Sequence, residues 1–175
     1  DCSSTKKGGI HIVKVITYGT YDLFHQGHYN LLKRAKELGD YLIVGVTSDA
    51  FDKSRGKLNV RDSLVKRIEN VRKTGFADEI IVEEYMGQKI DDIKRYHVDI
   101  FTVGSDWRGH FDYLNEYCKV QYLERTRGVS STAIRNKDSI SLGIIGAENI
   151  VNRFCEEAKY VSGINIVCTY NPEME

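Results

Sequence analysis

Residues 19–28 read GTYDLFHQGH, and the segments on either side of this stretch predict how the chain is organised. Before it, residues 12–18 are short and rich in β-branched side chains, which is typical of a buried strand. After it, apolar residues recur at the spacing of an amphipathic helix: Leu31, Leu32, Ala35 and Leu38. His25 and His28 therefore lie where a first strand gives way to a helix, at the edge where open α/β sheets bind ligands.

The spacing of the two histidines suits the binding of a phosphate. Gly27 allows the backbone to approach a ligand closely, because it carries no Cβ. Both imidazoles can direct donors at one anion, and a helix N-terminus adds unpaired N–H groups and the positive end of its dipole. Two ordinary polar histidines near a helix start are the alternative, but the strand, the glycine and the helix together favour a phosphate site.

The composition is that of an ordinary globular protein. The 175 residues suffice for one good α/β core, and 41% of them are apolar and 29% charged. A formal net charge of zero argues against a broad nucleic-acid or anionic-membrane surface. Apolar runs are too short to span a bilayer and no secretory pattern opens the chain, so we expect a cytoplasmic protein. No zinc-like spacing links the four cysteines, which we expect to be reduced thiols: Cys2, Cys118, Cys155 and Cys168.

Strands and helices alternate along residues 12–138, which predicts an α/β fold: a doubly wound, Rossmann-like parallel sheet of five strands with helices on both faces. The further strands are expected at residues 41–46, 80–82, 100–103 and 119–122, and further helices at 61–73 and 88–96. Residues 1–11 are expected to form a flexible lead-in.

Three local features complete this prediction. Gly39 is expected to cap the end of the first helix, and residues 51–57 to form a polar loop. One apolar face is expected on the helix at 61–73, formed by Leu64, Val65, Ile68 and Val71.

The pattern restarts within residues 139–175, where we expect a short βαβ-like extension: a strand at 140–145, a helix at 149–160 and a strand at 165–168. One side of that helix carries Ile150, Val151, Phe154 and Ala158. This segment resembles the start of a Gfo/Idh/MocA-type oxidoreductase, but Glu148 replaces the glycine that admits the pyrophosphate, and a carboxylate there would repel phosphates. We therefore interpret it as a truncated or vestigial start of a second domain.

Two stretches together resemble a known family. Residues 19–28 resemble the first, HxGH signature of the nucleotidylyltransferase superfamily, specifically of its cytidylyltransferase branch. Residues 125–132 (RTRGVSST) resemble the RTxGISTT signature of the same branch, and the resemblance extends over about residues 12–137. It implies transfer of CMP from CTP to a polyol phosphate, with glycerol phosphate expected, giving a CDP-polyol for teichoic-acid or capsule synthesis and pyrophosphate. It also implies Mg²⁺ bridging the phosphates and a homodimer.

The resemblance also implies roles for individual residues. Catalytic roles fall to His25, His28, Lys57 and Arg125. Nucleotide binding falls to Gly19, Thr20, Tyr21, His25, His28, Asp106, Arg125, Thr126, Gly128, Ser130, Ser131 and Thr132. The acceptor phosphate is assigned to Lys57 and Lys89, and no protein-borne metal site is expected.

Four residues near these motifs are open or depart from the pattern. Asp22 can hold a backbone turn as well as act in the site, and Arg55 stands where the family often has the first lysine of a Lys-x-Lys pair. Trp107 is expected to be a packing residue. Gly75 occupies the place of an arginine that related enzymes commonly carry before the third strand, which leaves that arginine's role in doubt.

Other functions stay open at this point. The acceptor could be phosphoethanolamine or phosphocholine, and an aromatic cage or an acid near the acceptor site would mark a choline acceptor. ATP could replace CTP, because adenylyltransferases share the HxGH signature. The chain could also be a non-catalytic nucleotide-binding module of a larger bifunctional protein, or a redox enzyme through residues 140–175.

Overall fold

The computed structural model describes residues 11–124, 134, 140–158 and 164–170. Within these ranges no helix combines the length and the apolar composition that a membrane span requires. The cysteines among them carry free thiols, as expected: Cys118, Cys155 and Cys168.

A single sheet of five parallel strands forms the centre of the larger unit. In chain order the strands are β1 (Lys14–Gly19), β2 (Tyr41–Thr47), β3 (Glu79–Glu83), β4 (Ile100–Gly104) and β5 (Lys119–Leu123). Their spatial order is β3-β2-β1-β4-β5, so the direction of winding reverses between β1 and β4. Ligands of such folds bind outside the carboxyl ends of the strands at that switch point.

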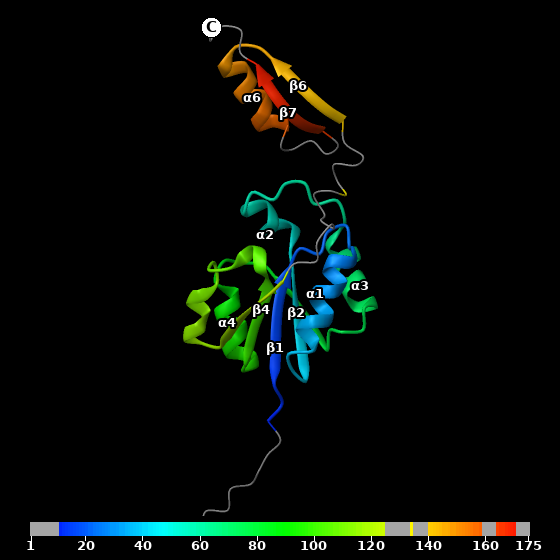
Figure 1. The fold of residues 1–175 in the computed structure, drawn as a ribbon, viewed down its shortest axis with the longest axis vertical. Coiled ribbons are helices and arrows are strands. Elements are labelled where there is room, and N and C mark those ends of the chain that lie inside the picture. Colours follow the sequence, from blue (N-terminus) through cyan, green and yellow to red (C-terminus); the bar gives the residue numbers. More distant parts are fainter. Residues whose placement is uncertain (1–10, 125–133, 135–139, 159–163, 171–175) are drawn as a thin grey trace, which may run out of the picture.

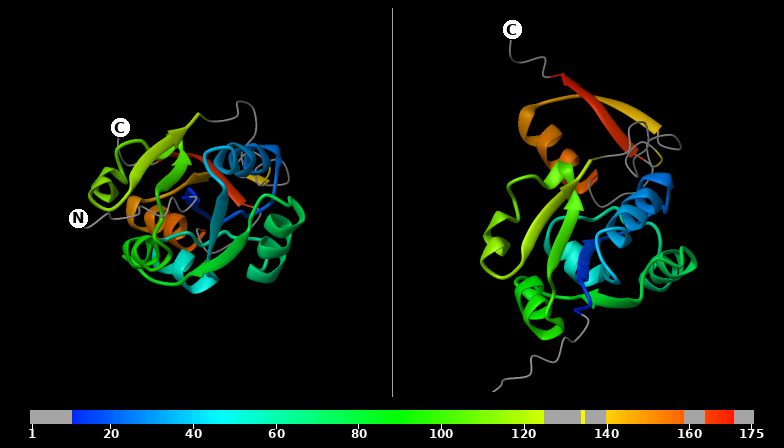
Figure 2. Two further views of the ribbon diagram at one scale, coloured as in Figure 1. Left: turned by 90° about the horizontal axis from the view of Figure 1, so that it is seen from below. Right: turned by 60° about the horizontal axis from the view of Figure 1, so that its bottom comes forward.

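Helices cover both faces of the sheet, which confirms the predicted doubly wound fold (Figures 1 and 2). On one face, α1 (Gln26–Lys36) and α3 (Leu64–Lys73) pack over residues such as Val15 and Val44. On the other, α4 (Gln88–Tyr96) and the short 3₁₀ helix η2 (Asp112–Glu116) pack over Ile16 and Phe101. Neighbouring residues of β1 thus enter opposite cores, as the alternation of side chains along a strand requires.

The prediction of a polar loop at residues 51–57 is wrong for its first half, because the chain forms the helix α2 (Asp49–Ser54) there. Ser48 accepts a hydrogen bond from the N–H of Phe51 at 3.1 Å and so caps this helix. Phe51 is buried and anchors the helix. One apolar anchor in six residues gives no periodic pattern, which is why the sequence did not indicate a helix.

Two smaller predictions are also wrong. Val65 does not belong to the buried face of α3, because its side chain is 70% exposed. Gly39 does not cap α1, because the helix ends at Lys36 with Glu37 as its C-cap. A Cβ on Gly39 would lie 2.6 Å from the carbonyl oxygen of Val13, so this glycine serves a close approach to the chain before β1.

The C-terminal unit has the predicted βαβ form. Its strands β6 (Ile140–Ile145) and β7 (Ile164–Tyr170) are parallel and joined through α6 (Glu148–Ala158). Val151 is buried, whereas Ile150 and Phe154, expected on the same side, are exposed. The side chain of Glu148 lies outside the described part of the chain, so the interpretation of this unit as part of a second domain stays a prediction.

Gly45 tests the packing of the central strands. A Cβ there would lie 2.2 Å from Cδ1 of Tyr18, whose hydroxyl is held by Asp92 at 2.8 Å. We expect Gly45→Ala to lower the free energy of unfolding by about 1–3 kcal/mol through overpacking, measured by urea denaturation. Gly104→Ala is the control, because no atom lies within 4 Å of its added Cβ; equal losses in both variants would contradict this explanation.

Candidate active site

The two histidines of the first signature build the N-terminus of α1. His25 is the N-cap residue, and its Nδ1 accepts a hydrogen bond from the N–H of Gly27 at 3.0 Å. The Nδ1 of His28 accepts from the N–H of His25 at 3.3 Å, which completes a reciprocal capping box. The two rings stack with their centroids 3.9 Å apart. The spacing that predicted a phosphate site thus also caps the helix.

This capping arrangement determines where the imidazole protons lie. Because each Nδ1 accepts a backbone hydrogen bond, the proton of each neutral ring is placed on Nε2, which makes Nε2–H of His25 and His28 a donor. The first turn of α1 holds no acidic residue, so no carboxylate offsets the positive end of the helix dipole. The junction therefore presents imidazole donors and a helix N-terminus to an anion.

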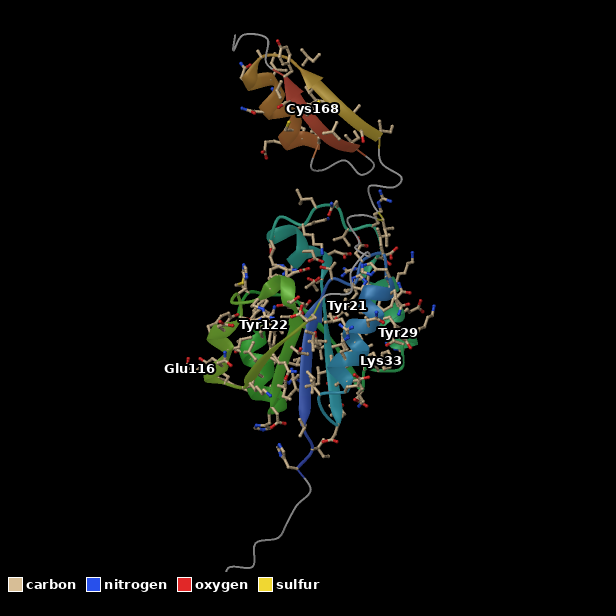
Figure 3. All side chains as sticks on the ribbon, in the orientation of Figure 1. Tyr21, Tyr29, Lys33, Glu116, Tyr122 and Cys168 are labelled. Carbon is tan, nitrogen blue, oxygen red and sulfur yellow. The ribbon has the colours of Figure 1, made fainter. Side chains whose placement is uncertain are left out.

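The loop between β1 and α1 is anchored by a buried aromatic side chain. Tyr21 and Leu23 both have positive φ angles, an uncommon conformation for residues with side chains. The buried ring of Tyr21 meets His28 edge-on, with the ring centroids 5.6 Å apart. Tyr21 lies close to the start of α1, whereas Tyr29 and Lys33 lie on the exposed side of that helix (Figure 3). Burial raises the pKa of the Tyr21 hydroxyl. Tyr21, predicted to bind nucleotide, thus supports the histidine with its side chain.

Asp22 takes the turn-holding role that the sequence left open. Its buried Oδ1 accepts the backbone N–H groups of Arg61 at 3.1 Å and Asp62 at 2.9 Å, just before α3. The first-signature loop is thereby tied to the start of α3.

Arg67 of α3 is fully buried and joins the carboxyl ends of β1 and β2. Its Nη1 donates to the carbonyl oxygens of Thr20 and Thr47, each at 2.8 Å. Its Nε donates to the carbonyl of Asp62 at 3.1 Å, and its Nη2 pairs with the carboxylate of Asp49. The loops that follow both strands therefore start from fixed points.

Asp52 of α2 links this buried centre to the cations of the following loop. Its fully buried carboxylate accepts from the hydroxyls of Thr20 at 3.1 Å and Thr47 at 2.7 Å. It also pairs with Nη2 of Arg55 at 2.6 Å. The Nζ of Lys57 donates to the Thr20 hydroxyl oxygen at 2.7 Å. The Thr20 hydroxyl thus donates its hydrogen bond to Asp52 and accepts one from Lys57. In this structure the hydroxyl hydrogen of Thr20 is therefore not directed at a ligand.

This network gathers cations at the carboxyl ends of β1 and β2. Three cations, Arg55, Lys57 and Arg67, meet two carboxylates, Asp49 and Asp52, among the described residues that bond here. Cations beside a helix N-terminus suit a polyphosphate. Arg55 forms an ion pair with Asp52 and Lys57 donates to the Thr20 hydroxyl, so both side chains are positioned next to the end of β1.

Lys89, predicted to bind the acceptor phosphate, lies on the other face of the sheet near the carboxyl end of β3. Its ammonium pairs with the buried carboxylate of Glu83 and lies 4.6 Å from the ring centroid of Tyr18. Burial lowers the pKa of Lys89, and the charge of Glu83 opposes this effect.

The segment after β4 carries Asp106 and Trp107 on the short 3₁₀ helix η1 (Ser105–Trp107). Both side chains are exposed, and Trp107 packs against Phe111 with ring centroids 5.9 Å apart. Trp107 is thus a surface packing residue, as expected, and the nucleotide-binding role of Asp106 stays a prediction.

The second signature lies outside the described residues, and so do its predicted site residues: Arg125, Thr126, Gly128, Ser130, Ser131 and Thr132. Glu124, directly before it, follows the carboxyl end of β5, and its carbonyl accepts from Arg34 of α1 at 2.7 Å. Glu124 therefore lies beside α1, just past the carboxyl end of β5.

Sequence reasoning missed several buried charged residues, among them Asp52, Arg67 and Glu83. For Arg67 a signal exists, because it shares one helical face with Leu64, Ile68 and Val71 and so occupies an expected core position. The sequence offers no comparable signal for Asp52 or Glu83.

Comparison with known proteins shows the family of this chain. The chain belongs to the cytidylyltransferase-like family, whose model matches residues 16–137. It is 50% identical over 129 residues to the glycerol-3-phosphate cytidylyltransferase of Bacillus spizizenii, an alignment that covers 74% of this chain and 98% of that protein. The enzyme of the same name from Staphylococcus aureus is 45% identical over 126 residues, or 71% of this chain and 93% of that protein.

More distant likenesses extend to other acceptors and to fold. An ethanolamine-phosphate cytidylyltransferase from Dictyostelium discoideum is 29% identical over 161 residues, covering 87% of this chain and 43% of that protein. In fold, the chain resembles a lipopolysaccharide core biosynthesis protein from Thermoplasma volcanium, with a TM-score of 0.56, 23% identity and coverage of 66% of this chain and 98% of that one.

The network around Thr20 generates a prediction for Lys57. We expect Lys57→Met to lower kcat/KM for CTP by about a hundredfold, because a positioned cation is lost from the phosphate site. Lys53→Met is the matched control: Lys53 is an exposed lysine of the neighbouring α2, and its removal should change kcat/KM by less than about twofold. Similar losses in both variants would show that general loop charge, rather than the bond from Lys57 to Thr20, is what matters.

Proposed function

We propose that this chain is an enzyme that transfers CMP from CTP to glycerol phosphate, giving CDP-glycerol and pyrophosphate. The observation that carries the proposal is the capping box of His25 and His28, which makes Nε2–H of both rings a donor at the N-terminus of α1. The glycerol-3-phosphate cytidylyltransferases at 45–50% identity support the nucleotide and the acceptor.

The reaction needs positioning more than covalent chemistry. An oxygen of the acceptor phosphate forms a bond to the α-phosphorus of CTP, the bond from that phosphorus to the bridging oxygen breaks, and pyrophosphate leaves with the electron pair. His25 and His28 donate hydrogen bonds to phosphate oxygens as negative charge moves toward the leaving group, and Lys57 neutralises part of that charge. Roles for Arg125 and the rest of the second signature remain part of the proposal.

Magnesium enters the proposal as the partner of CTP. Among the described residues, no group of three or more His, Cys, Asp or Glu side chains is placed to hold a metal ion. Mg²⁺ prefers oxygen ligands and keeps several waters, so the triphosphate and water would supply its ligands. When bound it would neutralise phosphate charge. We further propose a homodimer, as the family resemblance implies, and a cytoplasmic location, as expected from the sequence; analytical ultracentrifugation tests the dimer.

Pyrophosphate release tests the function directly. Incubation with Mg²⁺, CTP and glycerol phosphate should release pyrophosphate, whereas ATP in place of CTP should release little. Binding of CTP without release, with every acceptor tried, would instead favour the nucleotide-binding module.

Two variants of His28 separate catalysis from capping. In His28→Asn the Oδ1 atom can replace Nδ1 as acceptor for the N–H of His25, but the Nε2–H donor is lost. We expect its stability to stay near that of the wild type while kcat falls about a hundredfold or more. In His28→Gln a donor is retained near the Nε2 position but the cap is lost, so we expect higher kcat than in His28→Asn and a stability loss of about 1 kcal/mol. Unchanged turnover in His28→Asn would refute the catalytic role.

A further inference from the structure

The ammonium of Lys89 lies among side chains of the kind that bind cations. Its Nζ lies 4.6 Å from the ring centroid of Tyr18 and 5.5 Å from that of Phe111, and it pairs with the carboxylate of Glu83. We call Tyr18, Glu83 and Phe111 the Lys89 cage. Aromatic faces and a carboxylate around one ammonium are the arrangement by which proteins recognise choline-like cations.

One oxygen of the cage carboxylate is left without a hydrogen bond. Glu83 is 1% exposed, and its Oε2 has no hydrogen-bond partner among the described residues. A buried carboxylate oxygen of this kind is costly and favours a cation nearby. Lys89 itself is largely withdrawn from solvent, with 12% of its side chain exposed, and a desolvated ammonium gains most from aromatic faces.

The walls of the cage are held in place. The hydroxyl of Tyr18 donates to Asp92 at 2.8 Å, and the amide of Gln88 donates to the same carboxylate oxygen at 3.1 Å. The Gln88 amide also bonds to the carbonyl of Val82 in β3 at 2.8 Å. Tyr18 therefore presents a fixed ring face to the ammonium.

The cage lies at the same edge of the sheet as the nucleotide site. Glu83 ends β3 and pairs in register with Thr47 of β2, whose hydroxyl oxygen lies 3.2 Å from that of Thr20. Two strand spacings separate Thr20 from Glu83, which is about 10 Å. An acceptor at this edge would therefore reach both the cage and the phosphates of CTP.

We propose that Lys89 is a specificity-determining residue: by filling this cage with the chain's own ammonium, it excludes acceptors with a cationic head and admits phosphomonoesters with a neutral, hydroxylated tail. The role in acceptor choice rests on the proposed function. The cage itself is a feature of the fold and does not depend on that function. The ammonium of an acceptor would find the aromatic faces of the cage already covered by Lys89. The like charge of Lys89 would also repel it, so the wrong acceptor is selected against by repulsion.

The test compares Lys89→Ala with Lys94→Ala. Lys94 is a matched control, because it also lies on α4 with its ammonium over an aromatic ring, Tyr117 at 4.8 Å, but it is exposed. Each chain is titrated with methylammonium and tetramethylammonium by calorimetry, and its kcat/KM is measured for glycerol phosphate, phosphoethanolamine and phosphocholine. Thermal unfolding and CTP binding establish that each variant is folded.

We expect Lys89→Ala to bind the ammonium ions at least about tenfold more tightly than the wild type or Lys94→Ala. Its preference for glycerol phosphate over the two amine-bearing acceptors should fall by at least about tenfold. Lys89→Met, which refills the space without charge, should not bind the ions.

A folded Lys89→Ala chain that binds no ammonium ion would overturn the proposal, and so would a wild-type chain that uses phosphocholine as readily as glycerol phosphate. Should Lys89→Ala fail to fold, Lys89→Gln opens the same position, and absence of ammonium binding there has the same meaning. Failure of the proposed function looks different: the wild-type chain then releases no pyrophosphate with any acceptor, while the ammonium titration still tests the cage.

Discussion

The guanidinium of Arg67 is the interaction on which the rest of the site depends. It is fully buried and donates to the carbonyl of Thr20, directly after β1, and to that of Thr47, which ends β2, while pairing with the carboxylate of Asp49. Removing one partner of a buried charged set costs about 3–5 kcal/mol, because the remaining charge stays uncompensated. The strand ends, the start of α2 and the start of α3 are therefore fixed together, and the loops that bear the ligand groups inherit that rigidity.

From this fixed edge the chain separates two chemistries. On one side lie the cation of Lys57 and the histidine-capped N-terminus of α1, which suit a triphosphate. On the other, Lys89 lies among aromatic rings and the carboxylate of Glu83, where positive charge is balanced within the protein. The paired ends of neighbouring parallel strands bring these two sides to one edge of the sheet, about 10 Å apart.

Sequence patterns predicted the sheet, because continuous apolar runs mark strands that are covered on both faces. They also predicted where the two histidines lie, since these residues are three positions apart at one strand–helix junction. Arg67 and Asp52 escaped prediction, because charged residues are ordinarily exposed and their burial depends on partners distant in sequence. The Lys89 cage likewise combines Tyr18 of β1, Glu83 of β3 and Phe111, the residue before η2. Only the folded chain brings these three residues together.

Nucleotide is expected to bind at the edge of the sheet that Arg67 holds. Hydrogen exchange measured by mass spectrometry, with and without CTP and Mg²⁺, is the direct test. Binding at this edge predicts slower exchange at residues 19–28 and 47–57 and no change in the C-terminal β6–α6–β7 unit. Protection confined to residues 140–170, or none at residues 19–28 under conditions where CTP is bound, would contradict it.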